Sequence, residues 1–150
     1  MTHQRPLIRN PARETLKGGG ALFGFNVFES LRPSVAKIAA QTGYNILLVE
    51  NEHVVHNDET LTNFLILARD NGLAPTVTVL VPERPFVSRM LDAGALGICL
   101  SHAEEPEQVE ALVRWMKYAP VGERGLALGA NVDYAGSDVA RYCREANEAT

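Results

Sequence analysis

Side chains suited to acid–base chemistry gather directly after an apolar run at residues 44–49. The sequence there reads Glu50-Asn51-Glu52-His53, and His56 follows. An imidazole that titrates near neutrality beside carboxylates is suited to act as a general base or to hold a metal-bound water. A solvated loop with one hydrogen-bonded histidine would look the same in sequence, so both interpretations stay open. The spacing His53-x-x-His56 lacks the HExxH frame and gives little support for zinc ligation through that pair.

Further polar residues follow the other apolar runs of the chain. They are Glu29 and Ser30, then Glu83 and Arg84, then Ser101, His102, Glu104 and Glu105. In folds with parallel strands, sites form on the loops at the carboxyl ends of the strands, so all of these positions are candidates. His102 is interpreted either as a substrate contact or as an ordinary surface histidine.

Three features outside those loops have a structural and a functional interpretation. Asp92 precedes an apolar run, where a carboxylate caps a helix or pairs with another group, and a ring nitrogen of His53 is one possible partner. Arg124, in Gly122-Glu123-Arg124-Gly125, is either an anion clamp or half of a structural ion pair. The glycines at 18–20 lack the Lys-Ser/Thr of a P-loop and precede a strand, so they predict a flexible turn.

The elements that position these residues alternate between apolar runs and helical periodicities. The runs are short, nearly continuous in hydrophobicity and typical of strands buried on both faces; they span 21–28, 44–49, 74–81 and 95–100. Helices are predicted from Ser34 to Gly43, from Asp58 to Gly72, from Pro85 to Gly94, from Pro106 onward and from Val139 to the last residue. The pattern is a βα unit repeated four times, followed by a loop and a helix.

Two α/β architectures satisfy this pattern. An open, doubly wound sheet fits a chain of 150 residues, whereas a closed (β/α)8 barrel needs about 250 residues. Length alone therefore favours the open sheet and a single domain spanning 1–150.

Composition excludes several classes of protein. The chain is 46% hydrophobic and 21% charged with a formal charge of −4, which predicts a globular fold without a basic nucleic-acid surface. Charged or polar residues interrupt every apolar stretch, so no membrane span is predicted. The N-terminus has no apolar segment of a signal peptide. Cys99 and Cys143 form no CxxC pair and are predicted to be buried thiols in the cytoplasm.

Four segments together resemble a known family. They are LLVENEHVVHNDETL, VSRMLDAGALGI, MKYAPVGERGLALGANVDYAG and YCREANEAT. In order and spacing they are similar to the metal-dependent class II pyruvate aldolases of the HpcH/HpaI type, which act on 4-hydroxy-2-oxo acids and 2-keto-3-deoxy sugar acids. The resemblance extends from about residue 10 to residue 150.

The resemblance implies a TIM-barrel fold, usually assembled into a homo-oligomer, that forms or cleaves a C–C bond beside a pyruvate enolate held on Mg²⁺, Mn²⁺ or Co²⁺. It reverses the preference for an open sheet, and the chain then corresponds to the first half of the barrel. His53 matches the family's catalytic histidine, which works through a metal-bound water, and Asp92 matches the acid that orients it. The family's Glu and Asp metal ligands would lie beyond Thr150, so no metal ligand is assigned here.

The remaining positions assigned to the substrate are Glu50, Thr78 and Arg124. Glu50 stands where the family usually has Asp. Thr78 stands where the family has the Arg that holds pyruvate, and a neutral hydroxyl supplies neither the charge nor the bidentate fork of a guanidinium. Two further departures, Asn45 for Asp and Lys37 for Glu, have no assigned role.

Two functions of different classes follow. The first is a lyase that cleaves a 4-hydroxy-2-oxo acid to pyruvate and an aldehyde, with His53 as acid–base and Asp92 as its orienting partner. The second is a non-catalytic barrel or half-barrel subunit that assembles with itself or with a partner, because the metal carboxylates are missing and Thr78 replaces the arginine. A small open-sheet binding domain unrelated to aldolases is a weaker third interpretation.

Overall fold

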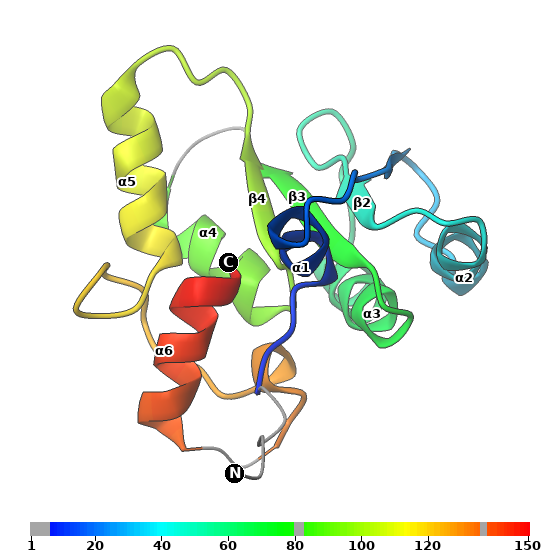
Figure 1. Ribbon diagram of the computed structural model, residues 1–150. Helices are drawn as coiled ribbons and strands as arrows, with labels where there is room; N and C mark the ends of the chain where they lie inside the picture. Colours follow the sequence, from blue (N-terminus) through cyan, green and yellow to red (C-terminus); the bar gives the residue numbers. More distant parts are fainter. Residues whose placement is uncertain (1–6, 80–82, 136–137) are drawn as a thin grey trace, which may run out of the picture.

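A computed structural model describes residues 7–79, 83–135 and 138–150 (Figure 1). The strands are β1 (Gly24–Val27), β2 (Ile46–Val49), β3 (Ala74–Val79) and β4 (Gly97–Leu100). The helices are α1 (Pro11–Lys17), α2 (Pro33–Gln41), α3 (Asp58–Asp70), α4 (Arg84–Asp92), α5 (Pro106–Met116) and α6 (Val139–Ala149), with a 3-10 turn η1 (Ala130–Val132). The last two residues predicted for the third strand, 80 and 81, lie outside the described residues.

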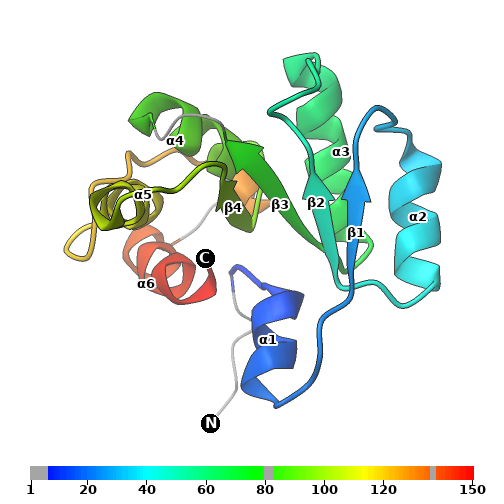
Figure 2. The ribbon, with the colours of Figure 1, turned by 90° about the horizontal axis from the view of Figure 1, so that it is seen from above.

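The sheet has the topology of a barrel segment. Its four strands are parallel and stand in the order β1-β2-β3-β4, so each strand pairs with its neighbours in sequence. A doubly wound sheet reverses its strand order at a switch point, and no reversal occurs among the described strands. Viewed from above, helices α2, α3, α4 and α5 form an arc around one side of the sheet, whereas α1 lies on the opposite side from α3 (Figure 2). The doubly wound architecture favoured by chain length is therefore wrong.

The main core lies between the two inner strands and helices α2, α3 and α4. Leu47, Val49 and Val77 point from the sheet into a cluster with Phe64 and Leu65 of α3, and these side chains are at most 2% exposed. Burial of aliphatic and aromatic side chains supplies most of the favourable free energy that holds helices against a sheet. The core therefore fixes the loop after β2 between two packed elements.

The outer strands are less buried than the sequence predicts. Three of the four residues of β1 are exposed, and β4 exposes Cys99 and only partly buries its other residues. Both strands are edges of the described sheet, so one side of each has no neighbouring strand to cover it. The predictions that all strands are buried on both faces and that both cysteines are buried are wrong: Cys99 is exposed and Cys143 is half-buried.

The helices begin and end within a few residues of their predicted start and stop positions. Gly43, Gly72 and Gly94 follow α2, α3 and α4 with φ of 90°, 76° and 113°, values that favour glycine. The residue that caps α3 is Asn57 instead of Asp58, because the Asn57 side chain accepts the backbone N–H groups of residues 59 and 60. Ser34 does not cap α2, which begins one residue earlier at Pro33.

Helix α1 is not predicted from the sequence, although Asn10 and Pro11 carry the signals for its start. The Asn10 side chain accepts the Arg13 N–H at 3.2 Å, and proline occupies the first turn. The same Asn10 donates to the Leu96 carbonyl at 3.2 Å and to the Ala149 carbonyl at 2.8 Å. Helices α1 and α6 thereby close over the amino ends of β3 and β4, and the glycines after α1 form the predicted turn.

Among the described residues, no helix combines the length and apolarity that crossing a membrane requires.

Replacing Leu65 with alanine is expected to lower the free energy of unfolding by about 2 to 5 kcal/mol, because a completely buried side chain leaves a cavity in the core. The matched control is Leu16→Ala in α1, where the same change at a side chain 57% exposed is expected to cost about 0.5 kcal/mol or less. Urea unfolding followed by circular dichroism measures both. Equal losses in the two variants would contradict the core described here.

Candidate functional site

The loop after β2 folds around the carboxylate of Glu50. Its Oε1 accepts the backbone N–H of Glu52 at 2.6 Å and that of His53 at 3.0 Å. The N–H just before these two, that of Asn51, donates to the hydroxyl oxygen of Thr78 at 2.7 Å. Two side chains thus satisfy three consecutive backbone donors. This cradle, formed by Glu50, Thr78 and the N–H groups of residues 51–53, fixes the path of the chain that carries His53.

Thr78 comes from the neighbouring strand β3 and is 4% exposed. Its hydroxyl lies 3.3 Å from Glu50 Oε1 and 3.4 Å from the Val49 carbonyl oxygen. A buried hydroxyl needs partners to offset its lost hydration, and Thr78 has them on both sides. The sequence assigns Thr78 to substrate binding, whereas in this structure its hydroxyl is engaged with the cradle.

Burial would raise the pKa of the Glu50 carboxyl, but the N–H groups of Glu52 and His53, the Thr78 hydroxyl and the nearby His53 ring lower it, and the lowering outweighs the burial. Hydrogen bonds donated to the ionised form favour that form. The Glu50 carboxylate is therefore held charged at neutral pH with its pKa below the usual value. A carboxylate in this state is an acceptor only, which suits it to hold a loop.

Two histidines approach one carboxylate oxygen at the carboxyl end of the sheet. The loops after β2 and β4 form the mouth of the site there. His102, from the loop after β4, places Nε2 at 3.1 Å from Glu52 Oε1, and His53 places Nε2 at 3.8 Å from the same atom. The side chains of His53 and His102 are 71% and 73% exposed, whereas the Glu52 side chain is 10% exposed. Glu52 is thus a largely buried acid between two exposed imidazoles. The sequence places all three residues at strand ends but does not pair them.

His56 has a structural role in the same loop. Its Nε2 lies 2.8 Å from the backbone carbonyl oxygen of Glu50, so the ring closes the loop from the far side.

Asp92 and Arg124 lie at the other end of the sheet. Asp92 is the last residue of α4, shortly before β4 begins, whereas His53 follows the carboxyl end of the parallel strand β2. Asp92 Oδ1 accepts from Arg124 Nη2 at 2.8 Å. Among the described residues of this chain, Asp92 pairs with Arg124 and not, as predicted, with His53.

Arg124 is interpreted from this geometry as a structural residue. Its side chain is 1% exposed, and its guanidinium lies over the Tyr118 ring at 4.7 Å from the centroid. A buried cation is tolerated when an anion and an aromatic face replace its hydration, and Asp92 with Tyr118 supply both. Of the two interpretations of Arg124 that the sequence leaves open, the ion pair describes the contacts seen.

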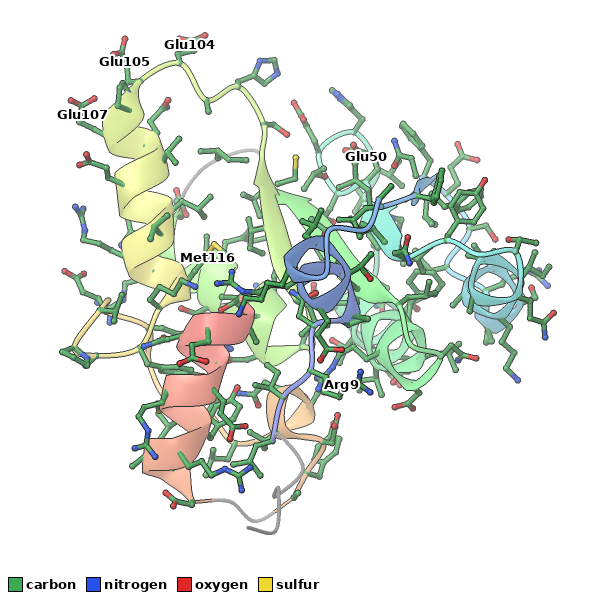
Figure 3. The ribbon with its side chains drawn as sticks, viewed as in Figure 1. Arg9, Glu50, Glu104, Glu105, Glu107 and Met116 are labelled. Carbon is green, nitrogen blue, oxygen red and sulfur yellow. The ribbon has the colours of Figure 1, made fainter. Side chains whose placement is uncertain are left out.

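The other candidates at strand ends make structural contacts or are exposed. Arg84 Nη2 donates to the Glu123 carbonyl at 2.6 Å, and Glu105 caps α5 together with Gln108. Glu29 and Ser30 after β1 are exposed. Figure 3 shows Glu50, Glu104 and Glu105 at the carboxyl end of the sheet, well away from Arg9. The described mouth is thus rich in carboxylates and imidazoles.

The described residues do not form a set of ligands for the metal that the resemblance implies. Among residues 7–79, 83–135 and 138–150, no three His, Cys, Asp or Glu side chains are arranged around a common metal position. The Glu50 carboxylate, the most buried acid of the mouth, is already occupied by the cradle. The described residues alone therefore do not fit a hard, oxygen-coordinated divalent ion.

Comparison with known proteins gives a consistent set of relatives, although no family model matches the chain. It is 30% identical over 126 residues to the 2-keto-3-deoxy-L-rhamnonate aldolase of Escherichia coli K12, covering 84% of this chain and 46% of that protein. It is 31% identical over 123 residues to the hydroxypyruvate/pyruvate aldolase of Roseobacter denitrificans, covering 81% and 47%. The chain spans about half the length of the curated relatives it matches.

Solved structures give the same result. The HpcH/HpaI aldolase of Desulfitobacterium hafniense superposes with a TM-score of 0.87 at 26% identity, over 91% of this chain and 53% of that one. The citrate synthase SbnG superposes with a TM-score of 0.75 at 26% identity, over 91% and 51%. The parallel strand order, the helices arranged around it and these matches converge: the chain is a homologue of the HpcH/HpaI aldolases and has the fold of about half of their TIM barrel.

Proposed function

We propose that this chain contributes the His53 side of an aldolase active site, in a reaction that cleaves a 4-hydroxy-2-oxo acid to pyruvate and an aldehyde. The observation that carries the proposal is the cradle, which holds the loop bearing His53 at the carboxyl end of the sheet. TIM-barrel enzymes place their chemistry at that end. The relatives named as pyruvate-type aldolases support the same reaction class.

His53 is the group proposed to exchange the proton. Retro-aldol cleavage requires a base for the hydroxyl at C4 and an acid for the carbon that becomes the methyl group of pyruvate. His53 is exposed toward the mouth, and an imidazole serves both roles near neutral pH. Glu50 and Thr78 act as positioning residues through the backbone of residues 51–53. Glu52 places its Oε1 atom 3.8 Å from His53 Nε2, close enough to orient the ring.

The divalent metal expected for this class would stabilise the enolate when bound. Since the described residues do not form its cage, no ligand of this chain is assigned to it. Homo-oligomeric assembly is likewise proposed from the resemblance, and a cytoplasmic location is proposed from the two cysteines, which form no CxxC pair.

A half-barrel that acts through assembly is the second candidate. The observation that favours it is the pair of sheet edges, because neither β1 nor β4 has an outer neighbour among the described strands. Phe23, Phe25 and Phe28, in and around β1, are 62%, 38% and 48% exposed. Unpaired edges with apolar side chains favour pairing with another chain. Light scattering during size-exclusion chromatography tests it, and a stable monomer would count against it.

The aldolase proposal predicts that the purified chain with Mn²⁺, Mg²⁺ or Co²⁺ releases pyruvate from a 4-hydroxy-2-oxo acid. His53→Ala is expected to lower kcat by about 10² to 10⁴, the usual contribution of a positioned acid–base group. Val55→Ala, at a side chain 99% exposed in the same loop, is the matched control and should keep the activity. A coupled lactate dehydrogenase assay measures pyruvate. Absence of pyruvate with every metal and several substrates would reject the lyase in favour of the assembly function.

The cradle predicts a pH-dependent contribution to stability. Because the pKa of Glu50 is lowered in the folded chain, its stabilisation is present above the ordinary glutamate pKa and is lost as the pH falls through the lowered value. Glu50→Gln should therefore be less stable than wild type at pH 7, and the difference should shrink as the pH falls below the ordinary glutamate pKa and through the lowered value. Glu110→Gln, at an exposed position of α5, is the control. Urea unfolding at several pH values measures the difference; a constant gap would contradict the prediction.

A further inference from the structure

We propose that His102 is a positioning residue of the candidate site: it holds the carboxylate of Glu52 in place against the ring of His53. His102 lies in the loop after β4, 50 positions from Glu52, so the strand order of the sheet brings the two side chains together. The arrangement of the three side chains is independent of any reaction. Its effect on catalysis rests on the proposed aldolase function, in which His53 exchanges the proton.

The Glu52 carboxylate is held by one imidazole and adjoins the other. Its Oε1 atom lies 3.1 Å from His102 Nε2, a hydrogen-bond distance, and 3.8 Å from His53 Nε2, which is too long for a hydrogen bond. An ionised carboxylate only accepts, so His102 donates through its Nε2–H group. His102 therefore fixes the carboxylate, while His53 meets the negative charge without sharing the hydrogen bond.

The burial of Glu52 makes this support necessary. Its side chain is 10% exposed, whereas those of His102 and His53 are 73% and 71% exposed. A largely buried carboxylate loses much of its hydration and needs donors in place of water. Among the residues that the structure describes, the two imidazoles are the side-chain contacts of this carboxylate. Without the His102 ring, nothing in this set would fix the carboxylate beside His53.

The backbone of His102 adopts a conformation that most residues seldom take. Its φ is 52°, in the left-handed region, which costs free energy for any residue that has a Cβ atom. Such conformations persist where surrounding contacts maintain them, and they gather at functional sites. A glycine would avoid the strain but would supply no ring. The histidine at this position therefore supports a role for its side chain.

A fixed carboxylate would assist His53 in the proposed retro-aldol reaction. His53 takes the proton of the C4 hydroxyl, the C3–C4 bond breaks to give an aldehyde and an enolate, and the proton returns to C3 to give pyruvate. The imidazole is therefore positively charged between the two transfers. A carboxylate beside it stabilises that charge and orients the ring. Since His102 keeps Glu52 at this distance, its loss should slow the reaction more than it weakens substrate binding.

The first test measures kcat and KM in the coupled assay of pyruvate release. His102→Gly should lower kcat by about tenfold to 10²-fold with KM little changed, as expected for a lost orientation. Glycine is used because it keeps a φ of 52° without strain. Glu52→Gln should lose at least as much, and the double variant no more than Glu52→Gln alone, because His102 acts through Glu52. His102→Gln, which carries an N–H donor as many bonds from Cα as Nε2, should recover most of the lost rate. An unchanged kcat in His102→Gly, or additive losses in the double variant, would overturn the proposal.

The second test does not depend on the reaction. In NMR spectra, the ring resonances of His53 should shift in both His102→Gly and Glu52→Gln and move back toward their wild-type positions in His102→Gln. Glu104→Gln, at an exposed position of the same loop as His102, is the matched control and should leave these resonances and kcat unchanged. The expected shifts without pyruvate release from wild type would reject the aldolase function and keep the arrangement. Unshifted His53 resonances in His102→Gly would reject the arrangement itself.

Discussion

The carboxylate of Glu50 is the group on which the order of the mouth depends. Three consecutive backbone N–H groups follow a buried strand, where each would cost free energy if left without an acceptor. Glu50 takes two of them and Thr78 takes the third. Because Thr78 belongs to β3, the arrangement also joins the loop to the next strand. The backbone that carries His53 is therefore held by hydrogen bonds although its own ring is exposed, and the same loop brings Glu52 to His102.

The two ends of the sheet are stabilised in different ways. At the amino end, the Arg124–Asp92 pair is stacked on Tyr118, and α1 packs against α6; buried aromatic and ionic groups there resist change. At the carboxyl end, exposed imidazoles surround two largely buried acids, Glu50 and Glu52. This division agrees with the general behaviour of TIM barrels, in which residues at the amino end serve stability and residues at the carboxyl end serve chemistry. It also explains why Asp92 and Arg124, which look functional in the sequence, make structural contacts here.

The sequence predicts some of these features well and others poorly, for physical reasons. Apolar runs and glycine stops locate all four strands and five of the six helices, because burial and positive φ act through single residues. The sequence also places Glu50, Glu52, His53 and His102 at the carboxyl ends of strands, which is where the structure has them. The contact between Glu52 and His102 spans 50 positions and depends on the order of the strands, so no local pattern contains it. Helix α1 escapes prediction because its seven residues carry little periodicity, and its packing partner α6 lies at the far end of the chain.

Thr78 and Glu50 are best understood as a coupled departure from the family pattern. An arginine at position 78 would place a cation beside the acid at position 50. With threonine there, backbone N–H groups and one hydroxyl stabilise the charge of Glu50 instead, and its pKa stays low without a guanidinium. The extra methylene of glutamate relative to aspartate lengthens its reach around the turn toward those donors. For the proposed aldolase reaction, an oxo acid would meet no guanidinium from position 78, and the loss of such a preorganised donor typically lowers the rate by about 10² to 10³. Threonine at position 78 thus supplies hydrogen bonds that hold the loop, but it lacks the charge with which an arginine would bind an anion.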